Sequence, residues 1–183
     1  MLHIALISAS VREGRRSHRL ALFLDKAVKD AGHSTDLIDL KAVDLPLLPE
    51  RYKFMKSAPA PLTDLVERFR KADAVIIVSP EYNGSIPAAL KNVIDALTED
   101  WYRKPVAIAS ASSGAFGGAQ LVSQLVFSLW KIKALVVSGA LQVPKVHEQF
   151  DENGTPADPA AWEPRVRTLL NELEWAIQAT RPL

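Results

Sequence analysis

The sequence contains no cysteine among its 183 residues. Disulfide bonds, thiolate metal ligands and cysteine nucleophiles are therefore excluded from its chemistry. An excess of charge of either sign is also absent, because 22 lysines and arginines balance 21 aspartates and glutamates. This balance does not indicate a polyanionic partner, so we expect no binding to nucleic acid.

Long hydrophobic runs are missing as well. No stretch approaches the roughly 20 apolar residues that a membrane-spanning helix requires. The first apolar run is short and has no cationic segment before it, so it lacks the pattern of a signal peptide. No internal repeat or low-complexity linker divides the chain. We therefore expect one domain over residues 1–183, in a soluble cytoplasmic protein that contacts no membrane.

The sequence does contain two kinds of segment in regular alternation: short continuous apolar runs, typical of buried strands, and segments with apolar residues at helical spacing. Because parallel strands need right-handed crossover helices, this alternation predicts an α/β fold in three layers. We expect a doubly wound, five-stranded parallel sheet in the order 2-1-3-4-5. The five runs predicted as strands are Leu2–Ile7, His33–Leu40, Ala72–Val78, Lys104–Ser110 and Ala134–Val143.

Two residues should limit these strands. Pro80 is expected to end the third strand, because proline cannot donate to a strand ladder. Gly139 is expected to bend the fifth strand. The connection over residues 41–61 contains four prolines and is long for a compact domain. It is either a cover over a functional site or an ordered surface loop.

The first strand runs into a cationic loop that precedes a helix. A helix start carries unpaired N–H groups and a partial positive charge, so it attracts anions. Ser10 and Ser17 can add hydroxyl donors, and Arg12 and Arg15 can add full charges. The loop suits a terminal phosphate group, although a capped helix start with solvated arginines has the same pattern.

In open parallel sheets, ligands bind beyond the carboxyl ends of the strands, where the strand order reverses. For the order 2-1-3-4-5, three loops meet there: Ser10–Ser17, Pro80–Ser85 and Ser112–Gly118. The first is cationic, and the other two are rich in small polar residues and glycine, which lets backbone N–H groups approach a ring edge. This combination suits a phosphate at one end and a flat polar heterocycle at the other, which is the shape of flavin mononucleotide (FMN).

Other nucleotide-binding folds fit less well. The first strand is not followed by G-x-G-x-x-G, and G-x-x-x-x-G-K-[ST] is absent, so neither a dinucleotide-binding Rossmann site nor a P-loop is indicated. A phospho-receiver domain needs an acceptor aspartate after the third strand, where Ser79-Pro80 stands instead.

Three motifs carry a resemblance to a known family. They are S-A-S-V-R-E-G-R-R-S from Ser8, S-P-E-Y-N-G-S-I-P from Ser79 and S-S-G-A-F-G-G-A-Q from Ser112, with K-N-V-I-D from Lys91 after the second. In this order they resemble the NADPH-dependent FMN reductases. That flavodoxin-like group also includes quinone, azo and chromate reductases.

The resemblance implies the roles of individual residues. The FMN phosphate would be held by Ser10, Arg12, Arg15 and Ser17. The isoalloxazine would lie along Pro80, Glu81, Tyr82, Asn83 and Gly84. The third loop would flank either this ring or the ribityl chain of FMN through Ser113, Gly114 and Gly117. The family forms dimers or tetramers, so the resemblance also implies a homodimer or homotetramer, with the helix around Lys91–Leu97 as one face.

The implied activity is that of an FMN-dependent NAD(P)H oxidoreductase. We expect a ping-pong cycle, in which FMN takes hydride from NADPH or NADH and then passes two electrons to a quinone, flavin, azo compound or similar small acceptor. No side chain is nominated as a catalytic acid or base, and no metal site is expected. The alternatives are a non-enzymatic electron carrier like flavodoxin and a flavin-binding sensor. The nearly neutral charge and the arginine-rich loop argue against the carrier.

Overall fold

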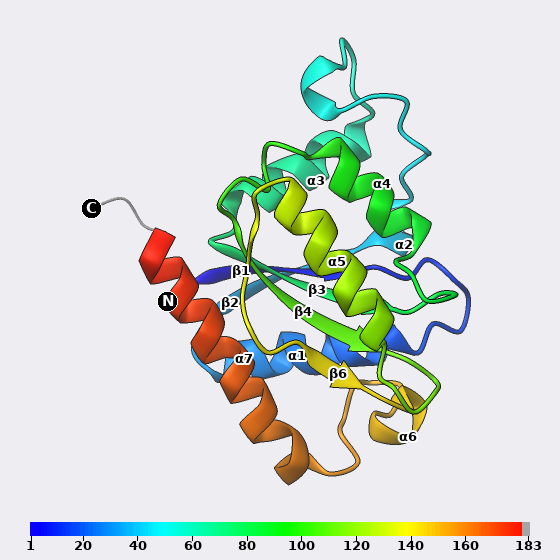
Figure 1. Ribbon diagram of the computed structural model, residues 1–183, viewed down its shortest axis with the longest axis vertical. Coiled ribbons are helices and arrows are strands. Elements are labelled where there is room, and N and C mark those ends of the chain that lie inside the picture. The colour runs from blue at the N-terminus through cyan, green and yellow to red at the C-terminus, as the bar shows by residue number, and fades with distance from the viewer. Residues whose placement is uncertain (181–183) are drawn as a thin grey trace.

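A parallel sheet lies at the centre of the protein, whose computed structural model describes residues 1–180 (Figure 1). Within these residues the strands are β1 (His3–Ser8), β2 (Ser34–Asp39), β3 (Ala74–Pro80), β4 (Pro105–Ala111), β5 (Leu135–Val136) and β6 (Leu141–Val143). Their order is β2-β1-β3-β4-β5, and β6 also pairs with β4. Every pairing is parallel. The predicted class and strand order are confirmed.

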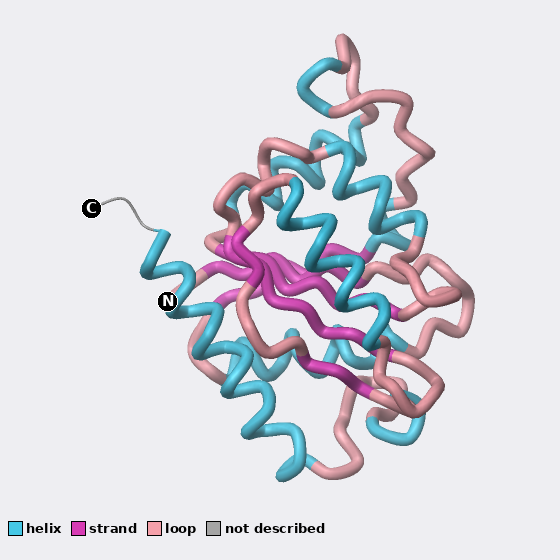
Figure 2. The backbone as a smooth tube through the Cα atoms, viewed as in Figure 1, coloured by secondary structure: helices cyan, strands magenta, loops and turns pink. Residues whose placement is uncertain are grey.

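Helices cover both faces of the sheet, so the molecule has three layers (Figure 2). On one face lie α1 and α7, and on the other lie α3, α4 and α5 (Figure 1). The helices are α1 (Ser17–Asp30), α2 (Leu40–Val43), α3 (Ala60–Lys71), α4 (Ala88–Ala96), α5 (Ala119–Lys131), α6 (Val146–Gln149) and α7 (Pro159–Thr180), with a 3-10 turn η1 (Tyr52–Phe54).

Alternation along the central strands builds the two cores. In β1, Ile4 and Leu6 face the α1 and α7 layer, while Ala5 and Ile7 face the α3, α4 and α5 layer. Successive strand residues point to opposite faces, so a strand buried on both sides must be apolar throughout. This explains why the strand runs in the sequence are continuous rather than alternating.

Pro80 is the last residue of β3, opposite Ala111, so the prediction that it ends this strand is confirmed. A terminal position in a strand tolerates the missing N–H. One detail of the strand prediction is wrong. The predicted single fifth strand is two short strands that both pair with β4, and Gly139 lies between them with a positive φ of 79°. The sheet therefore has six strands, of which β5 and β6 share the position beside β4.

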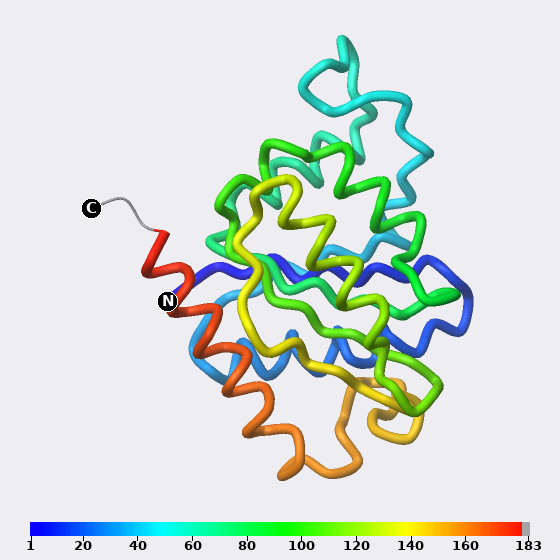
Figure 3. The backbone as a smooth tube through the Cα atoms, in the orientation of Figure 1, coloured from blue at the N-terminus to red at the C-terminus, as the bar shows by residue number. Residues whose placement is uncertain are grey.

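The connection between β2 and α3 projects from the α3 and α4 side (Figure 3). Asn92 of α4 fixes its first part, because its side chain donates to the Pro46 carbonyl at 2.9 Å and accepts from the Leu48 N–H at 3.0 Å. Leu48 packs partly against the core, whereas Leu47 is 87% exposed. The segment is an ordered surface loop over this part of its length.

Among residues 1–180, no helix combines the length and the apolar composition needed to cross a membrane.

An ion pair joins β2 to α3 and gives a prediction about acid stability. Arg68 holds Asp36 through bonds of 2.8 and 2.6 Å, and mainly for this reason the pKa of Asp36 lies below its ordinary value, against the effect of burial. A carboxyl whose folded pKa is depressed stabilises the fold above its unfolded pKa, and this contribution disappears as the pH falls through the folded pKa. We expect wild type to exceed Asp36→Asn in unfolding free energy by about 1 kcal/mol near pH 6, and the gap to close toward about pH 3.

The measurement is urea unfolding across that pH range. Asp64→Asn is the matched control, because Asp64 is 65% exposed and lies 3.4 Å from the same arginine. A constant gap between wild type and Asp36→Asn at every pH would contradict the prediction.

Candidate functional site

The pairing of β1, β3 and β4 brings three loops to one level at the carboxyl edge of the sheet. Ser8 lies opposite Val78, and Ser79 and Pro80 lie opposite Ser110 and Ala111. The loops that follow these three strands therefore begin side by side. The chain trace shows these loops gathered at one side of the molecule, at the right of the view (Figure 3).

Between the loops lies a crevice of about 330 Å³. Its walls include most of the residues predicted from the sequence, namely Ser10, Arg12, Arg15, Ser17, Pro80, Glu81, Tyr82 and Ser113. It is also lined by residues that were not predicted, namely Glu13, Gly14, Arg16, Ala111, Ser112 and Val146. Val146 comes from α6, which the apolar pattern did not reveal because this helix is only four residues long.

Four predicted residues, Asn83, Gly84, Gly114 and Gly117, do not line this crevice. Asn83 and Gly84 form the tip of a tight turn, in which Tyr82 and Ser85 exchange backbone hydrogen bonds of 2.9 and 3.0 Å. Both tip residues have positive φ, 51° and 73°, as a type I′ turn requires. They follow Tyr82, which is the last residue of this loop to line the crevice.

The glycines of the third loop serve its packing. Gly117 accepts a 2.6 Å hydrogen bond from the Ser110 hydroxyl through its carbonyl group. A Cβ on neighbouring Gly118, whose φ is 84°, would lie 3.0 Å from the Ser110 Cβ. Gly114 accepts backbone hydrogen bonds from Lys145, at 3.1 Å, and from the Ser112 hydroxyl, at 3.0 Å. These contacts hold the loop after β4 against α6.

Glu81 occupies the start of α5. Its carboxylate accepts hydrogen bonds of 3.1 Å from the N–H groups of both Gln120 and Leu121. A carboxylate at a helix start satisfies orphan donors and opposes the helix dipole. The acid of the second motif is therefore a cap that ties the loop after β3 to α5.

The start of α1 is different. Within residues 1–180 no side chain caps it, and its first turn contains no acidic residue. Ser17, its first residue, is buried in the crevice wall. Of the helices α1 and α5, which both begin beside the crevice, only α5 has N–H groups bonded to a carboxylate. An anion that enters the crevice would find its free donors at α1.

Arg15 is held by an acid that the sequence reasoning missed. Its guanidinium binds Asp39, at the end of β2, through both carboxylate oxygens, and it donates to the Ser10 carbonyl at 2.9 Å. Burial raises the pKa of Asp39, but the bonds from Arg15 and from the Lys41 N–H outweigh it, and the net pKa is lowered. No sequence pattern indicated this partner, because the meeting of Arg15 and Asp39 depends on the register of β1 and β2.

Arg12 and Tyr82 meet across the crevice. The Arg12 guanidinium lies over the Tyr82 ring, 3.5 Å from its centroid. The Tyr82 hydroxyl is hydrogen bonded to the Ser10 hydroxyl at 2.6 Å. These contacts join the loop after β1 to the loop after β3.

His18, on the first turn of α1, adds no charge to this region near neutral pH. Burial, followed by the positive charge of Arg15, lowers its pKa below 6.5. The Ser8 hydroxyl lies 2.9 Å from its Nδ1 atom. The cationic character of the crevice therefore comes from its arginines.

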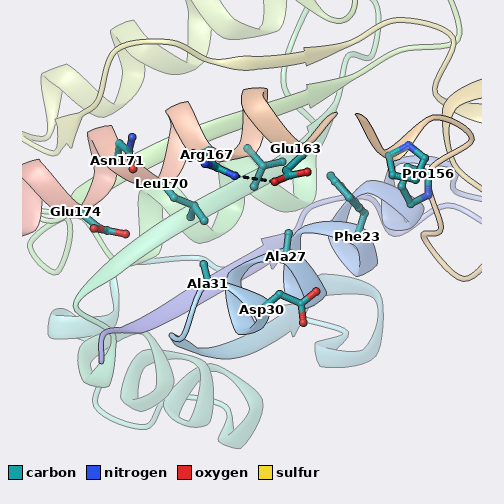
Figure 4. Close-up of a pocket in the computed structure, with 12 residues that line it drawn as sticks. Phe23, Ala27, Asp30, Ala31, Pro156, Glu163, Arg167, Leu170, Asn171 and Glu174 are labelled. Atoms are coloured by element: carbon teal, nitrogen blue, oxygen red, sulfur yellow. Dashed lines mark hydrogen bonds and ion pairs between the residues drawn. The ribbon is translucent and has the colours of Figure 1, made fainter. Parts of the chain in front are cut away.

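A larger cavity of about 430 Å³ lies elsewhere, between α1 and α7 (Figure 4). Its floor is apolar, with Phe23, Ala27 and Leu170, and the pair of Glu163 and Arg167, 2.6 Å apart, lies along its rim. None of the residues predicted from the sequence lines this groove.

The family described as "NADPH-dependent FMN reductase" matches residues 2–148. A quinone reductase of Escherichia coli is 34% identical over 142 residues, which are 75% of this chain and 74% of that protein. An NAD(P)H-dependent FMN reductase of Saccharomyces cerevisiae is 29% identical over 158 residues, 78% of this chain and 82% of that one.

Among solved structures, the flavoenzyme NAD(P)H:(acceptor) oxidoreductase of Paracoccus denitrificans has the same fold. Its TM-score is 0.82, with 24% sequence identity, and the match covers 97% of this chain and 98% of that one.

The pair of Arg15 and Asp39 gives a prediction about the rigidity of the first loop. Both side chains are largely buried, at 14% and 20% exposure, so their interaction should stabilise the fold. We expect a double-mutant cycle of Arg15→Met and Asp39→Asn to show a coupling of about 1–2 kcal/mol in urea unfolding. Asparagine keeps an oxygen for the Lys41 N–H, so the cycle isolates the ion pair.

The exposed pair of Lys91 and Asp95, on one helix face, serves as the comparison. Its coupling should stay below about 0.5 kcal/mol. Equal coupling energies for the two pairs would show that the ion pair of Arg15 and Asp39 does not stabilise the first loop.

Proposed function

The chain belongs to the NADPH-dependent FMN reductase family, and from this membership we propose that the crevice beyond β1, β3 and β4 is its FMN site. The protein is an FMN-dependent NAD(P)H oxidoreductase. What we add is the assignment of that activity to particular residues of the crevice.

One observation carries this assignment. Together on one wall of the crevice lie the start of α1, the buried Ser17 and Arg12; within residues 1–180 that helix start has no side-chain cap and Arg12 has no hydrogen bond or ion pair. A phosphate group with nearly two negative charges suits these donors, because backbone N–H groups and a guanidinium both favour a dianion. The residues present therefore fit the phosphate end of FMN. Ser10 and Ser17 would add hydroxyl donors there.

The second loop would serve the opposite end of the cofactor. Within residues 1–180, the N–H groups of Asn83 and Gly84 make no hydrogen bond to the protein, whereas those of Glu81 and Tyr82 bond to Ala111 and Ser85. The turn thus has two unused donors at its tip. We assign these donors to the polar ring edge of FMN, and Ser113, which lines the crevice, to the neighbouring wall.

When bound, FMN supplies the hydride and electron chemistry, and the protein binds and orients it. We propose a ping-pong cycle in which NAD(P)H enters the crevice and gives up its hydride, and oxidised NAD(P)⁺ leaves before a small oxidised acceptor enters the same crevice. Quinones are the favoured acceptors because of the quinone reductase relatives. Flavins and azo compounds remain within the proposed substrate class. The electron-carrier alternative is not favoured, because the relatives are reductases.

The purified protein should bind FMN and turn yellow. NADPH should bleach this colour without oxygen, and added quinone should restore it. Steady-state rates at several fixed quinone concentrations should give parallel double-reciprocal lines, as a ping-pong cycle requires. A protein that stays colourless after incubation with FMN would contradict the site, and intersecting lines would contradict the order of events.

We also propose that the protein associates with itself through α5. Twelve consecutive residues of this helix, Ala119–Trp130, carry no charge, and on its outer side Phe127 and Trp130 are 62% and 66% exposed. Exposed apolar patches of this kind are typical of interfaces. The helix expected from the resemblance, α4, lies beside α5, but its outer side carries the ion pair of Lys91 and Asp95.

This proposal predicts a dimer or tetramer that Trp130→Glu breaks into smaller species, because a buried charge at an apolar contact is costly. Light scattering after gel filtration measures the mass. Trp175→Glu is the matched control, since Trp175 is 64% exposed on α7, across the sheet. A monomeric wild type, or an assembly unaffected by both Trp130→Glu and Phe127→Glu, would remove α5 from the interface.

A further inference from the structure

Tyr82 stands on a rigid support at the edge of the crevice. Its backbone is fixed by two hydrogen bonds with Ser85, at 2.9 and 3.0 Å. Glu81 before it is fixed to the start of α5. Gly84, two residues further on, accepts a 2.7 Å hydrogen bond from the Gln124 side-chain amide of α5 through its carbonyl group. The backbone that carries Tyr82 is therefore held from both sides.

Two other charged groups of the first loop already have partners, whereas Arg16, like Arg12, has neither a side-chain hydrogen bond nor an ion pair within residues 1–180. Arg15 is bound to Asp39, and Glu13 is bound to Lys41 at 2.6 Å. Within the part of the chain that the structure describes, the Arg12 side chain makes neither a hydrogen bond nor an ion pair. Its one specific contact there is the Tyr82 ring, 3.5 Å away. All of its N–H donors are therefore unused.

We infer that Tyr82 is a positioning residue for the anion subsite of the crevice. Its ring fixes the Arg12 guanidinium, and its hydroxyl fixes the Ser10 hydroxyl, so that both groups are oriented before an anion arrives. The inference rests on the proposed function, because the anion is the phosphate of FMN.

The physical reason is side-chain entropy. An arginine on an exposed loop samples many rotamers, and binding an anion must restrict it to one of them. A guanidinium that lies over an aromatic ring is restricted in advance and keeps the N–H groups at its rim free. Tyr82 thus lowers the cost of binding without contacting the anion itself.

A second explanation for the tyrosine is direct contact with the flavin ring. The two explanations differ in their dependence on the phosphate. If Tyr82 acts through Arg12, its loss weakens FMN and leaves riboflavin, which has no phosphate, unaffected. If Tyr82 packs on the isoalloxazine, its loss weakens both flavins equally.

The test is a titration of the flavin-free protein with FMN and with riboflavin, in which the quenching of flavin fluorescence reports binding and gives each dissociation constant. We expect Tyr82→Leu to weaken FMN binding about five- to twentyfold and riboflavin binding less than about twofold. Tyr82→Phe keeps the ring and loses the bond to Ser10, so its effect on FMN should be the smaller of the two. Arg12→Ala should weaken FMN about ten- to hundredfold, also with little effect on riboflavin.

The double variant tests the route of the effect. In the Arg12→Ala background, Tyr82→Leu should add no more loss than Tyr82→Phe causes alone, because there is no guanidinium left to position. Tyr102→Leu is the matched control. Tyr102 is an exposed tyrosine with Arg103 over its ring at 5.2 Å, and it does not line the crevice. Its loss should leave both affinities unchanged.

Equal weakening of FMN and riboflavin by Tyr82→Leu would overturn the inference and leave the FMN site in place. Full additivity of Tyr82→Leu and Arg12→Ala would overturn it in the same way. A wild-type protein that binds neither flavin would instead remove the proposed function, and this inference with it.

Discussion

The parallel register of β1, β3 and β4 is the constraint on which the rest of the structure depends. It sets Ser8 beside Val78 and Ser79 beside Ser110, so the three strands end together and their loops enclose one crevice. The residues at these ends are small and buried, Ser8, Ser79 and Ser110 among them. Larger side chains at these positions would separate the loops, since the interior is close-packed. The chemistry of the site thus begins with strand pairing, before any charged residue is considered.

Electrostatics then divides the charges of this edge into two groups. Glu81 and Asp39 are used internally, one at the start of α5 and the other on Arg15. Arg12 and the start of α1 keep their donors. A crevice that contains acids and arginines in similar numbers therefore offers mainly donors to a ligand, because the acids are already paired. The composition of the loops alone gives no indication of this division.

Much of this architecture could be predicted from the sequence. The strands and their order followed from hydrophobic periodicity, and the three site loops followed from the switch in strand order. The bond between Arg15 and Asp39 could not be predicted, because it joins side chains 24 positions apart whose meeting depends on the register of β1 and β2. The cap formed by Glu81 and the division of the fifth strand were missed for the same reason. Periodicity locates elements, whereas side-chain pairing requires their relative placement.

The division of the predicted fifth strand into β5 and β6 has a consequence for how copies of the chain meet. An edge strand presents unpaired backbone groups that can template a strand of another molecule. Here one margin of the sheet is formed by β5, of two residues, and β6, of three residues, with Gly139 between them. The opposite margin, β2, carries Asp36 and Asp39, both held by arginines. The first margin is too short and broken to template a long ladder, and the charged residues of β2 oppose pairing at the second, so edge-to-edge polymerisation of sheets is discouraged and encounters between molecules are left to the helical layers.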